Sequence, residues 1–131
     1  MVGRLDGMAV LSRLCPLSHP NLRFVANADT SLIAEVNRGV LLLMAFWSGS
    51  SVTSYRRLMQ TLQTPAGRNI EVVVVDHDGA HPLYVIPEFS GRLGGNGETA
   101  WIRGGIIGAT TTGTTGPESF AQCLDSLLSA P

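Results

Sequence analysis

The first residues that could do chemistry are two serines at a predicted strand-to-helix turn, Ser51 and Ser54. A serine at such a turn becomes a nucleophile when a base and an orienting acid converge on it. The nucleophile-elbow motif, Gly-x-Ser-x-Gly, needs a second glycine, and Thr53 occupies that position. His77 and His81 follow the next predicted strand and can approach the same sheet edge. The motif therefore does not predict a serine nucleophile, although a general base remains available to Ser51.

One cluster of potential metal ligands lies after the second buried run, and its candidates are Asp76, His77, Asp78 and His81. Carboxylate and imidazole groups suit zinc or a harder ion, but the spacing has no matching pair of ligands elsewhere in the chain. We favour a solvated turn in which an aspartate caps the next helix. The sequence therefore predicts no metal and no other cofactor.

A glycine-rich loop, Gly91–Gly97, allows backbone N–H groups to crowd around an anion, as phosphate loops do. Both phosphate fingerprints continue into a helix, and one of them ends in Lys-Ser/Thr. This loop continues into a predicted strand and has neither feature. We interpret it as a flexible loop at the rim of the molecule.

The length, composition and net charge of the chain limit the kinds of protein it can be. The chain has 131 residues, 44% of them hydrophobic and 15% charged, with a net charge of −1, which is enough for one well-buried core. Scattered basic residues do not indicate a nucleic-acid or anionic-membrane partner. The apolar run Met8–Leu11 is bracketed by Asp6 and Arg13 too closely for a signal peptide or a spanning helix. We expect a cytoplasmic, soluble protein.

Two cysteines, Cys15 and Cys123, lie far apart in the sequence, and the chain has no Cys-x-x-Cys. Two lone thiols make no disulfide framework, and the cytosol keeps thiols reduced. Cys123 falls on the apolar stripe of the last predicted helix, which indicates a buried and unreactive thiol.

The serines must be positioned by a strand that feeds a helix. Val40–Trp47 is apolar without a break, which favours a strand buried on both faces of a parallel sheet. The next apolar residues recur at helical spacing, so a helix begins near Ser50 or Ser51. Ile70–Val75 is rich in valine and predicts a second central strand beside the first. The carboxyl edge of such a sheet is where open α/β folds bind ligands.

The remaining elements complete an α/β pattern. We predict a strand over Leu22–Ala26, a helix that Asp29 or Thr30 caps and Gly39 ends, and a short helix over Leu83–Phe89. A hairpin joins Thr99–Arg103 to Ile106–Thr111 through Gly104-Gly105, and a capping box at Thr115–Glu118 starts the last helix. Residues 1–21 form an extension with a short helix over Met8–Leu14, which either caps the core or stays mobile.

The segment Phe46–Ser54, in one-letter code FWSGSSVTS, resembles the active-site segment of thioredoxins. In that register the two redox cysteines fall on Ser51 and Ser54. The resemblance covers Leu22–Ser129 and implies an α/β, thioredoxin-like fold, with a central mixed sheet flanked by helices. We therefore divide the chain into an N-terminal extension, residues 1–21, and a thioredoxin-like domain, residues 22–131.

The resemblance also implies that redox chemistry is lost. Thioredoxins carry a buried acid before the Phe-Trp pair and a cis-proline opposite the cysteines, and here these positions are Ala45 and Gly97. A serine cannot form a mixed disulfide. An engineered pair of Cys→Ser substitutions would explain Ser51 and Ser54 but neither of the other two positions. We therefore favour a naturally thiol-free domain without disulfide oxidoreductase activity.

The resemblance implies two functions. The preferred one is a redox-inactive accessory or chaperone-like module that binds an extended polypeptide or another protein. Its groove would be lined by Trp47, Ser50, Ser51, Val52, Asn96 and Gly97, and the backbone of Asn96 and Gly97 would pair with the peptide. The alternative is a thiol- or glutathione-dependent enzyme of the same superfamily with Ser51 as the hydroxyl donor.

Overall fold

The computed structural model describes residues 7–90 and 94–129 and contains one mixed sheet of five strands in the order β1-β3-β2-β4-β5. Strands β1 and β2 both pair in parallel with β3, whereas β4 is antiparallel to β2 and to β5. The strands are β1 (Leu22–Val25), β2 (Arg38–Met44), β3 (Glu71–Asp76), β4 (Thr99–Arg103) and β5 (Ile106–Thr111). The predicted mixed sheet and its two central strands are confirmed.

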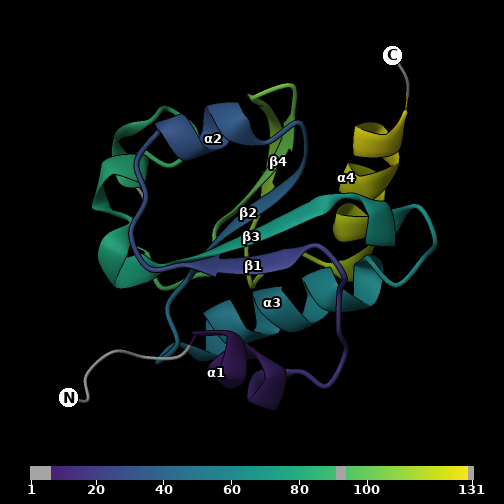
Figure 1. Cartoon of the computed structure of the whole chain (residues 1–131), viewed down its shortest axis with the longest axis horizontal. Helices are drawn as coiled ribbons and strands as arrows, with labels where there is room; N and C mark the ends of the chain where they lie inside the picture. The colour runs from purple at the N-terminus through teal and green to yellow at the C-terminus, as the bar shows by residue number, and fades with distance from the viewer. Residues whose placement is uncertain (1–6, 91–93, 130–131) are drawn as a thin grey trace.

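Helices cover both faces of this sheet (Figure 1). One face carries α1 (Gly7–Leu14), α3 (Gly49–Thr61) and α4 (Pro117–Leu128). The other carries α2 (Ser31–Glu35) and the short 3-10 helices His77–Gly79 and His81–Val85. A further 3-10 turn, Gly67–Asn69, precedes β3. Within the described ranges, no helix is both long and apolar enough to span a bilayer.

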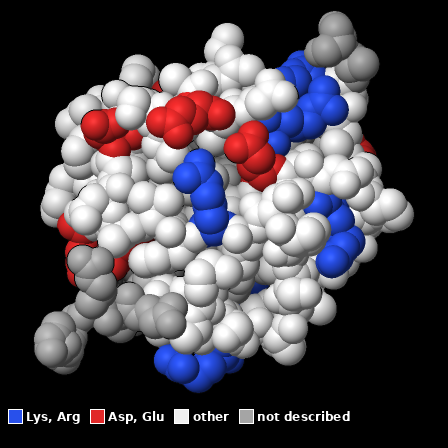
Figure 2. All heavy atoms as spheres, viewed as in Figure 1, with Lys and Arg blue, Asp and Glu red and all other residues white. Residues whose placement is uncertain are grey.

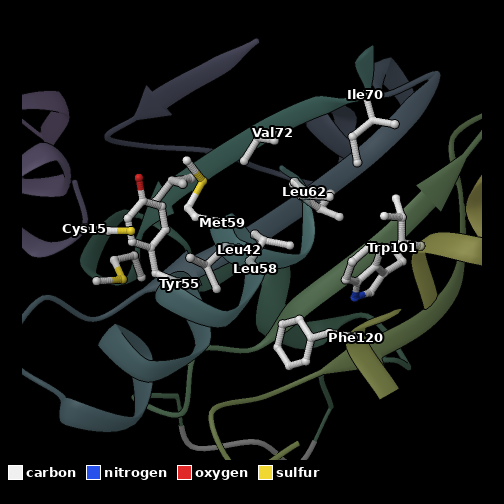
Figure 3. Close-up of a cluster of buried hydrophobic side chains, with 14 of the residues drawn as sticks. Cys15, Leu42, Tyr55, Leu58, Met59, Leu62, Ile70, Val72, Trp101 and Phe120 are labelled. Carbon is white, nitrogen blue, oxygen red and sulfur yellow. The ribbon is translucent and has the colours of Figure 1, made fainter. Parts of the chain in front are cut away.

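The core has two layers because successive side chains of a strand point to opposite faces. Val40, Leu42 and Met44 pack toward α3, whereas Leu41 and Leu43 pack toward α2, and all five are fully buried. Figure 3 shows part of the first layer, where Tyr55, Leu58 and Met59 from α3 meet the sheet. Each aliphatic side chain buried in this way stabilises the fold by roughly 1.5–3 kcal/mol.

Charged residues make up 15% of the chain. On the face drawn in Figure 2, arginines and acidic residues lie in small separate groups among uncharged residues. The chain has no lysine. The absence of a nucleic-acid partner, expected from the sequence, stays a prediction.

Gly39 does not end a helix, contrary to the sequence prediction. Helix α2 ends at Glu35, and Gly39 lies within β2, paired with Glu71 of β3. A Cβ atom at this position would lie 2.3 Å from the Glu71 carbonyl oxygen. The glycine therefore permits a close approach of two strands. At the other end of α2 the N-cap is Thr30, one of the two predicted residues, but its side chain makes no cap hydrogen bond. The Asp29 carboxylate instead accepts a hydrogen bond from the Ser31 N–H at 2.9 Å.

Two other predicted helix boundaries are wrong. The α4 cap is Gly116, without a side-chain hydrogen bond, while the Thr115 hydroxyl accepts from the Thr112 N–H at 2.9 Å. Pro117 starts α4, since a first-turn residue needs no N–H partner. The helix predicted over Leu83–Phe89 is instead the 3-10 helix His81–Val85. Strand β2 also ends at Met44 and not at Trp47.

The N-terminal segment packs on the core from residue 7 onward. The predicted helix is present as α1, and its Leu11 is fully buried. A Cβ at Gly7 would lie 2.4 Å from the Phe24 ring of β1, so the helix backbone rests directly on that ring. Of the two alternatives for the extension, its described part shows the one in which it caps the core.

His19 anchors the end of this segment. Its Nε2 atom lies 2.8 Å from the Gly67 carbonyl, and its Nδ1 atom accepts from the Asn21 N–H at 3.1 Å. These two bonds require a neutral imidazole protonated at Nε2. Burial lowers the pKa of His19 below its usual value of 6.5, and the charge of Arg68 acts in the same direction.

This neutral histidine makes stability depend on pH. Because its pKa is lower in the folded state, its contribution is complete above the unfolded pKa of 6.5 and is lost as the pH falls toward the folded pKa. Urea unfolding between about pH 5 and pH 8 should show the wild type losing free energy of unfolding relative to His19→Gln as the solution is acidified. Parallel pH profiles for the two proteins would contradict this assignment.

Candidate functional site

The candidate site is the N-terminal tip of α3, which β2 delivers to the carboxyl edge of the sheet. Ser48 is the N-cap, and its hydroxyl accepts from the Ser51 N–H at 3.4 Å. Its carbonyl accepts the first helical hydrogen bond, from the Val52 N–H at 3.1 Å. The helix begins at Gly49, slightly earlier than the sequence predicts, because Ser48 satisfies an N–H group that would otherwise be unpaired.

Ser51 and Ser54, the two serines that the resemblance aligns with redox cysteines, are both fully buried. The Ser51 hydroxyl oxygen accepts from the Ala45 N–H at 3.3 Å. The Ser54 hydroxyl donates to the Gly97 carbonyl at 2.8 Å and lies 3.5 Å from the Thr99 hydroxyl. Both hydroxyls therefore serve the packing of the tip, and neither is presented to solvent.

A short segment, Gly94–Gly97, lies over the tip, and we call it the strap. Three serines of the tip donate to it: Ser48 to the Gly95 carbonyl, Ser50 to the side-chain oxygen of Asn96, and Ser54 to the Gly97 carbonyl. On its far side, the Asn96 carbonyl accepts from the Gly113 N–H at 2.7 Å. The strap is therefore hydrogen bonded to α3 on one side and to the loop before α4 on the other.

Gly97 fits the tip because it has no side chain. Its φ of +66° is in the left-handed region, and a Cβ atom would lie 2.4 Å from the Ser54 Cβ and 3.0 Å from the Ser51 Cα. The structure thus brings together Gly97, Ser51 and Ser54, as the resemblance implied. It does so with the glycine packed against the serines, without space between them.

The predicted groove is only partly open. Trp47 is 72% exposed, and Ser50, Val52 and Asn96 are partly exposed, but Ser51 and Gly97 are buried and do not line a surface. The carbonyls of Asn96 and Gly97 are already bonded to Gly113 and Ser54. The placement of Ser51 and Gly97 in an open groove is therefore corrected, because the strap closes over them.

A row of aromatic rings runs from the tip toward the second face of the sheet. The Trp47 and His77 rings meet edge to face at 5.9 Å, and the His77 and Tyr84 rings do so at 5.5 Å. The His77 Nδ1 atom lies 2.9 Å from the Tyr84 hydroxyl. Burial, and then the negative charge of Glu98, raise the pKa of that hydroxyl, which stays protonated at neutral pH. His77 therefore lies between Trp47 and the neutral Tyr84 and contacts both rings.

Glu98 is a buried acid that sequence reasoning missed. Its side chain is 2% exposed, and its Oε1 atom has no hydrogen-bond partner among the described residues. Ala100 and Ile102 of β4 point toward the α2 layer, and alternate residues of a strand share one face. Extending that alternation back by two residues was the sequence signal that could have predicted the burial of Glu98. That signal was hidden because the residue follows a glycine-rich loop and looks like part of it. An unpaired buried carboxyl is costly, and it marks this side of the tip as unusual.

The predicted polar cluster does not form a site with the serines. The Asp76 carboxylate accepts from the Asp78 N–H at 3.0 Å and caps the following 3-10 turn, as predicted. His77 is engaged with Tyr84, and His81 lines a separate hollow beside α2. Over the described ranges, no three His, Cys, Asp or Glu side chains are grouped so as to hold a metal ion, and neither histidine hydrogen bonds to Ser51.

Comparisons with known proteins bear on the fold. No family model and no curated protein sequence matches the chain. Among solved structures, a mutant thioredoxin from Halobacterium salinarum matches with a TM-score of 0.61 at 14% identity, over 87% of this chain and 97% of that one. Desulfothioredoxin from Desulfovibrio vulgaris Hildenborough matches with a TM-score of 0.59 at 11% identity, over 83% and 99%.

A third match is a chain from a structural study of the thiol resolving mechanism in yeast mitochondrial 1-Cys peroxiredoxin via glutathione/thioredoxin systems. Its TM-score is 0.62 at 18% identity, over 84% of this chain and 99% of that one. At such identities the likeness concerns the fold alone. The chain has a thioredoxin-like fold.

Two glycines allow the packing of the strap to be measured. Gly97 and Gly104 have similar positive φ values, +66° and +60°, but a Cβ at Gly104 would meet nothing within 4 Å. Gly104→Ala should therefore report only the backbone strain, about 1–2 kcal/mol. Gly97→Ala should cost roughly 1–3 kcal/mol more, because it also pushes the strap from Ser54. Equal free energies of unfolding for the two variants, measured in urea, would show that the strap is not tightly packed.

Two adjacent serines allow the closure of the tip to be tested. Ser50 is partly exposed and Ser51 is fully buried. With iodoacetamide, the thiol of Ser51→Cys should react roughly tenfold or more slowly than that of Ser50→Cys, because it becomes accessible only when the strap opens. Peptide mapping by mass spectrometry separates these sites from Cys15 and Cys123. A faster reaction at position 51 would indicate an open groove.

Proposed function

We propose that this chain is a redox-inactive, thioredoxin-like module that binds a partner protein or an extended polypeptide through the surface around Trp47. The observation that carries the proposal is the use of the tip hydroxyls. Ser48, Ser50 and Ser54 all donate hydrogen bonds that hold the strap, in a place where disulfide exchange would need an accessible thiolate. These hydrogen bonds close the surface of the tip over Ser51 and Ser54.

The cysteines of the chain do not replace the missing thiols. Cys15 is 4% exposed and packs in the core against α3 and α1. Cys123 lies on α4 and is partly exposed, so the predicted burial of its thiol is wrong. Burial raises the pKa of the Cys123 thiol, which lowers its thiolate fraction at neutral pH. Neither residue belongs to the tip, so a disulfide oxidoreductase has no support here.

Trp47 supports a role in protein binding. Its ring is 72% exposed, yet it is held between His77 and the strap, where Gly95 approaches it so closely that a Cβ would lie 2.9 Å from the ring. A large aromatic side chain that is exposed and already ordered loses little entropy on binding, and such residues dominate protein interfaces. Asn96 is partly exposed, and its N–H group makes no hydrogen bond to the described residues, so it is available to a peptide carbonyl.

The glutathione-dependent alternative has no observation in its favour. It needs the Ser51 hydroxyl to donate to a ligand thiolate, and that hydroxyl is fully buried beneath the strap. A calorimetric titration with glutathione tests it directly. Micromolar binding that Ser51→Ala abolishes would favour the enzyme over the binding module.

Two side chains with the same exposed fraction provide a matched test of the proposed surface. Trp47 and Ile106 are both 72% exposed and lie on different elements. A partner captured by the wild type should be retained by Ile106→Ala and lost with Trp47→Ala, since truncating an aromatic anchor typically costs about 2 kcal/mol or more. Retention of the partner by Trp47→Ala, with thermal unfolding unchanged, would contradict the proposed surface.

The proposal also has a redox consequence. The purified chain should not reduce insulin disulfides above a blank, because the tip carries no cysteine.

A further inference from the structure

A second surface feature lies away from the α3 tip, between the edge strand β5 and α4. It is a hollow of about 640 Å³ that shares no lining residue with the tip. Its inner wall is apolar and consists of Trp101, Ala109 and Leu127. Figure 3 shows the Trp101 ring beside Phe120 of α4, and the two ring centroids are 6.2 Å apart. A hollow of this volume is in the range of small-molecule sites.

Small residues create the hollow. In register, Ala109 lies opposite Trp101, and Gly108 is the extra residue at the bulge where the pairing of β4 with β5 shifts. Neither residue has a side chain large enough to fill the space between β5 and α4. The exposed Ile106, at the hairpin end of β5, borders the same space.

Arg103 is the charged residue of the lining. Its Nη1 atom donates to the carbonyls of Ser126 and Ser129 at the end of α4, the first at 3.5 Å. Its remaining guanidinium donors have no partner, and no carboxylate pairs with it, within residues 7–90 and 94–129. Among the described residues, the hollow therefore combines an apolar wall with a cation at one end that no carboxylate neutralises. That combination is complementary to a carboxylate attached to an apolar chain.

We infer that this hollow binds an aliphatic monocarboxylic acid, with its carboxylate on Arg103 and its chain against Trp101, Ala109 and Leu127. The apolar carboxyl end of a polypeptide has similar chemistry, and an edge strand is a common place for a peptide to add. The bulge at Gly108 argues against that occupant, because it interrupts the regular ladder of β5 that an added strand would extend. A free acid needs only the hollow.

Probes that share one tail and differ in the head group test the inference on the full chain. Octanoate, octanol and octylamine are titrated below their aggregation concentrations and followed by calorimetry. Octanoate should bind saturably, and octanol should bind about tenfold more weakly or less, because it lacks the charge-assisted hydrogen bonds to the guanidinium. Octylamine should show no saturable binding. Equal affinity for octanoate and octanol would overturn the inference.

Substitutions of Arg103 locate the carboxylate. Arg103→Gln should reduce octanoate affinity to that of octanol, whereas Arg103→Lys should retain most of it through the charge. Arg23→Gln, on the opposite edge strand β1, is the matched control and should leave binding unchanged. Unchanged octanoate affinity in Arg103→Gln would overturn the inference. So would tighter binding of an acetylated hexapeptide that ends in leucine, because the occupant would then be a polypeptide.

A chemical readout is provided by Cys123, which lines the hollow and is partly exposed. Octanoate should slow its alkylation by iodoacetamide several-fold in the wild type and in Arg23→Gln, but not in Arg103→Gln. Ala109→Leu should fill the hollow and remove both the binding and the protection. If octanoate bound without protecting Cys123, the ligand would lie elsewhere and the inference would fail.

Discussion

The structure depends on the burial of β2 from Gly39 to Met44. The side chains from Val40 to Met44 alternate between two core layers and are all excluded from water. A strand that is covered on both faces can expose polar groups only where it ends. The turn after Met44, the cap at Ser48 and the first turn of α3 therefore gather at the carboxyl edge of the sheet. That placement sets the position of the serines in the candidate site.

Serine hydroxyl groups hold the strap on this tip by donating hydrogen bonds to it. A serine O–H is a good hydrogen-bond donor, whereas a thiol is a weak one. With Ser48, Ser50 and Ser54 the tip can hold a loop of glycines by its carbonyl and amide oxygens, and Gly97 can lie directly on Ser54. The same strand-to-helix geometry that suits disulfide exchange in thioredoxins is therefore compatible with a closed surface. In this chain, the serines that hold the strap and the glycine that packs against Ser54 together produce the closed tip.

Local patterns predicted much of the fold. The unbroken apolar run of β2, the valines of β3 and the Gly104-Gly105 turn each specify their element from a few neighbouring residues. Other features depend on residues far away in the sequence. Gly39 looks like a helix terminator, but Glu71 on another strand explains it. The burial of Ser51 depends on the strap, and the burial of Glu98 depends on which face β4 presents. No local pattern encodes the contacts of Gly39 and Ser51, whereas the two-residue alternation of β4 was a local signal for the burial of Glu98.

The strap bonds also have a kinetic consequence, because they join residues 43 to 47 positions apart. Helix α3 can form from local contacts within microseconds, but the strap continues into β4, and we expect it to reach α3 when the long-range pairing of β4 with β2 forms. We therefore expect the tip to close late in folding. We also expect it to open by local fluctuation while the strand ladders persist, since only a few hydrogen bonds must break. A ligand directed at Ser51 or Ser54 would then have to select this minor open population, and its apparent affinity would be reduced by the fraction of molecules in that state.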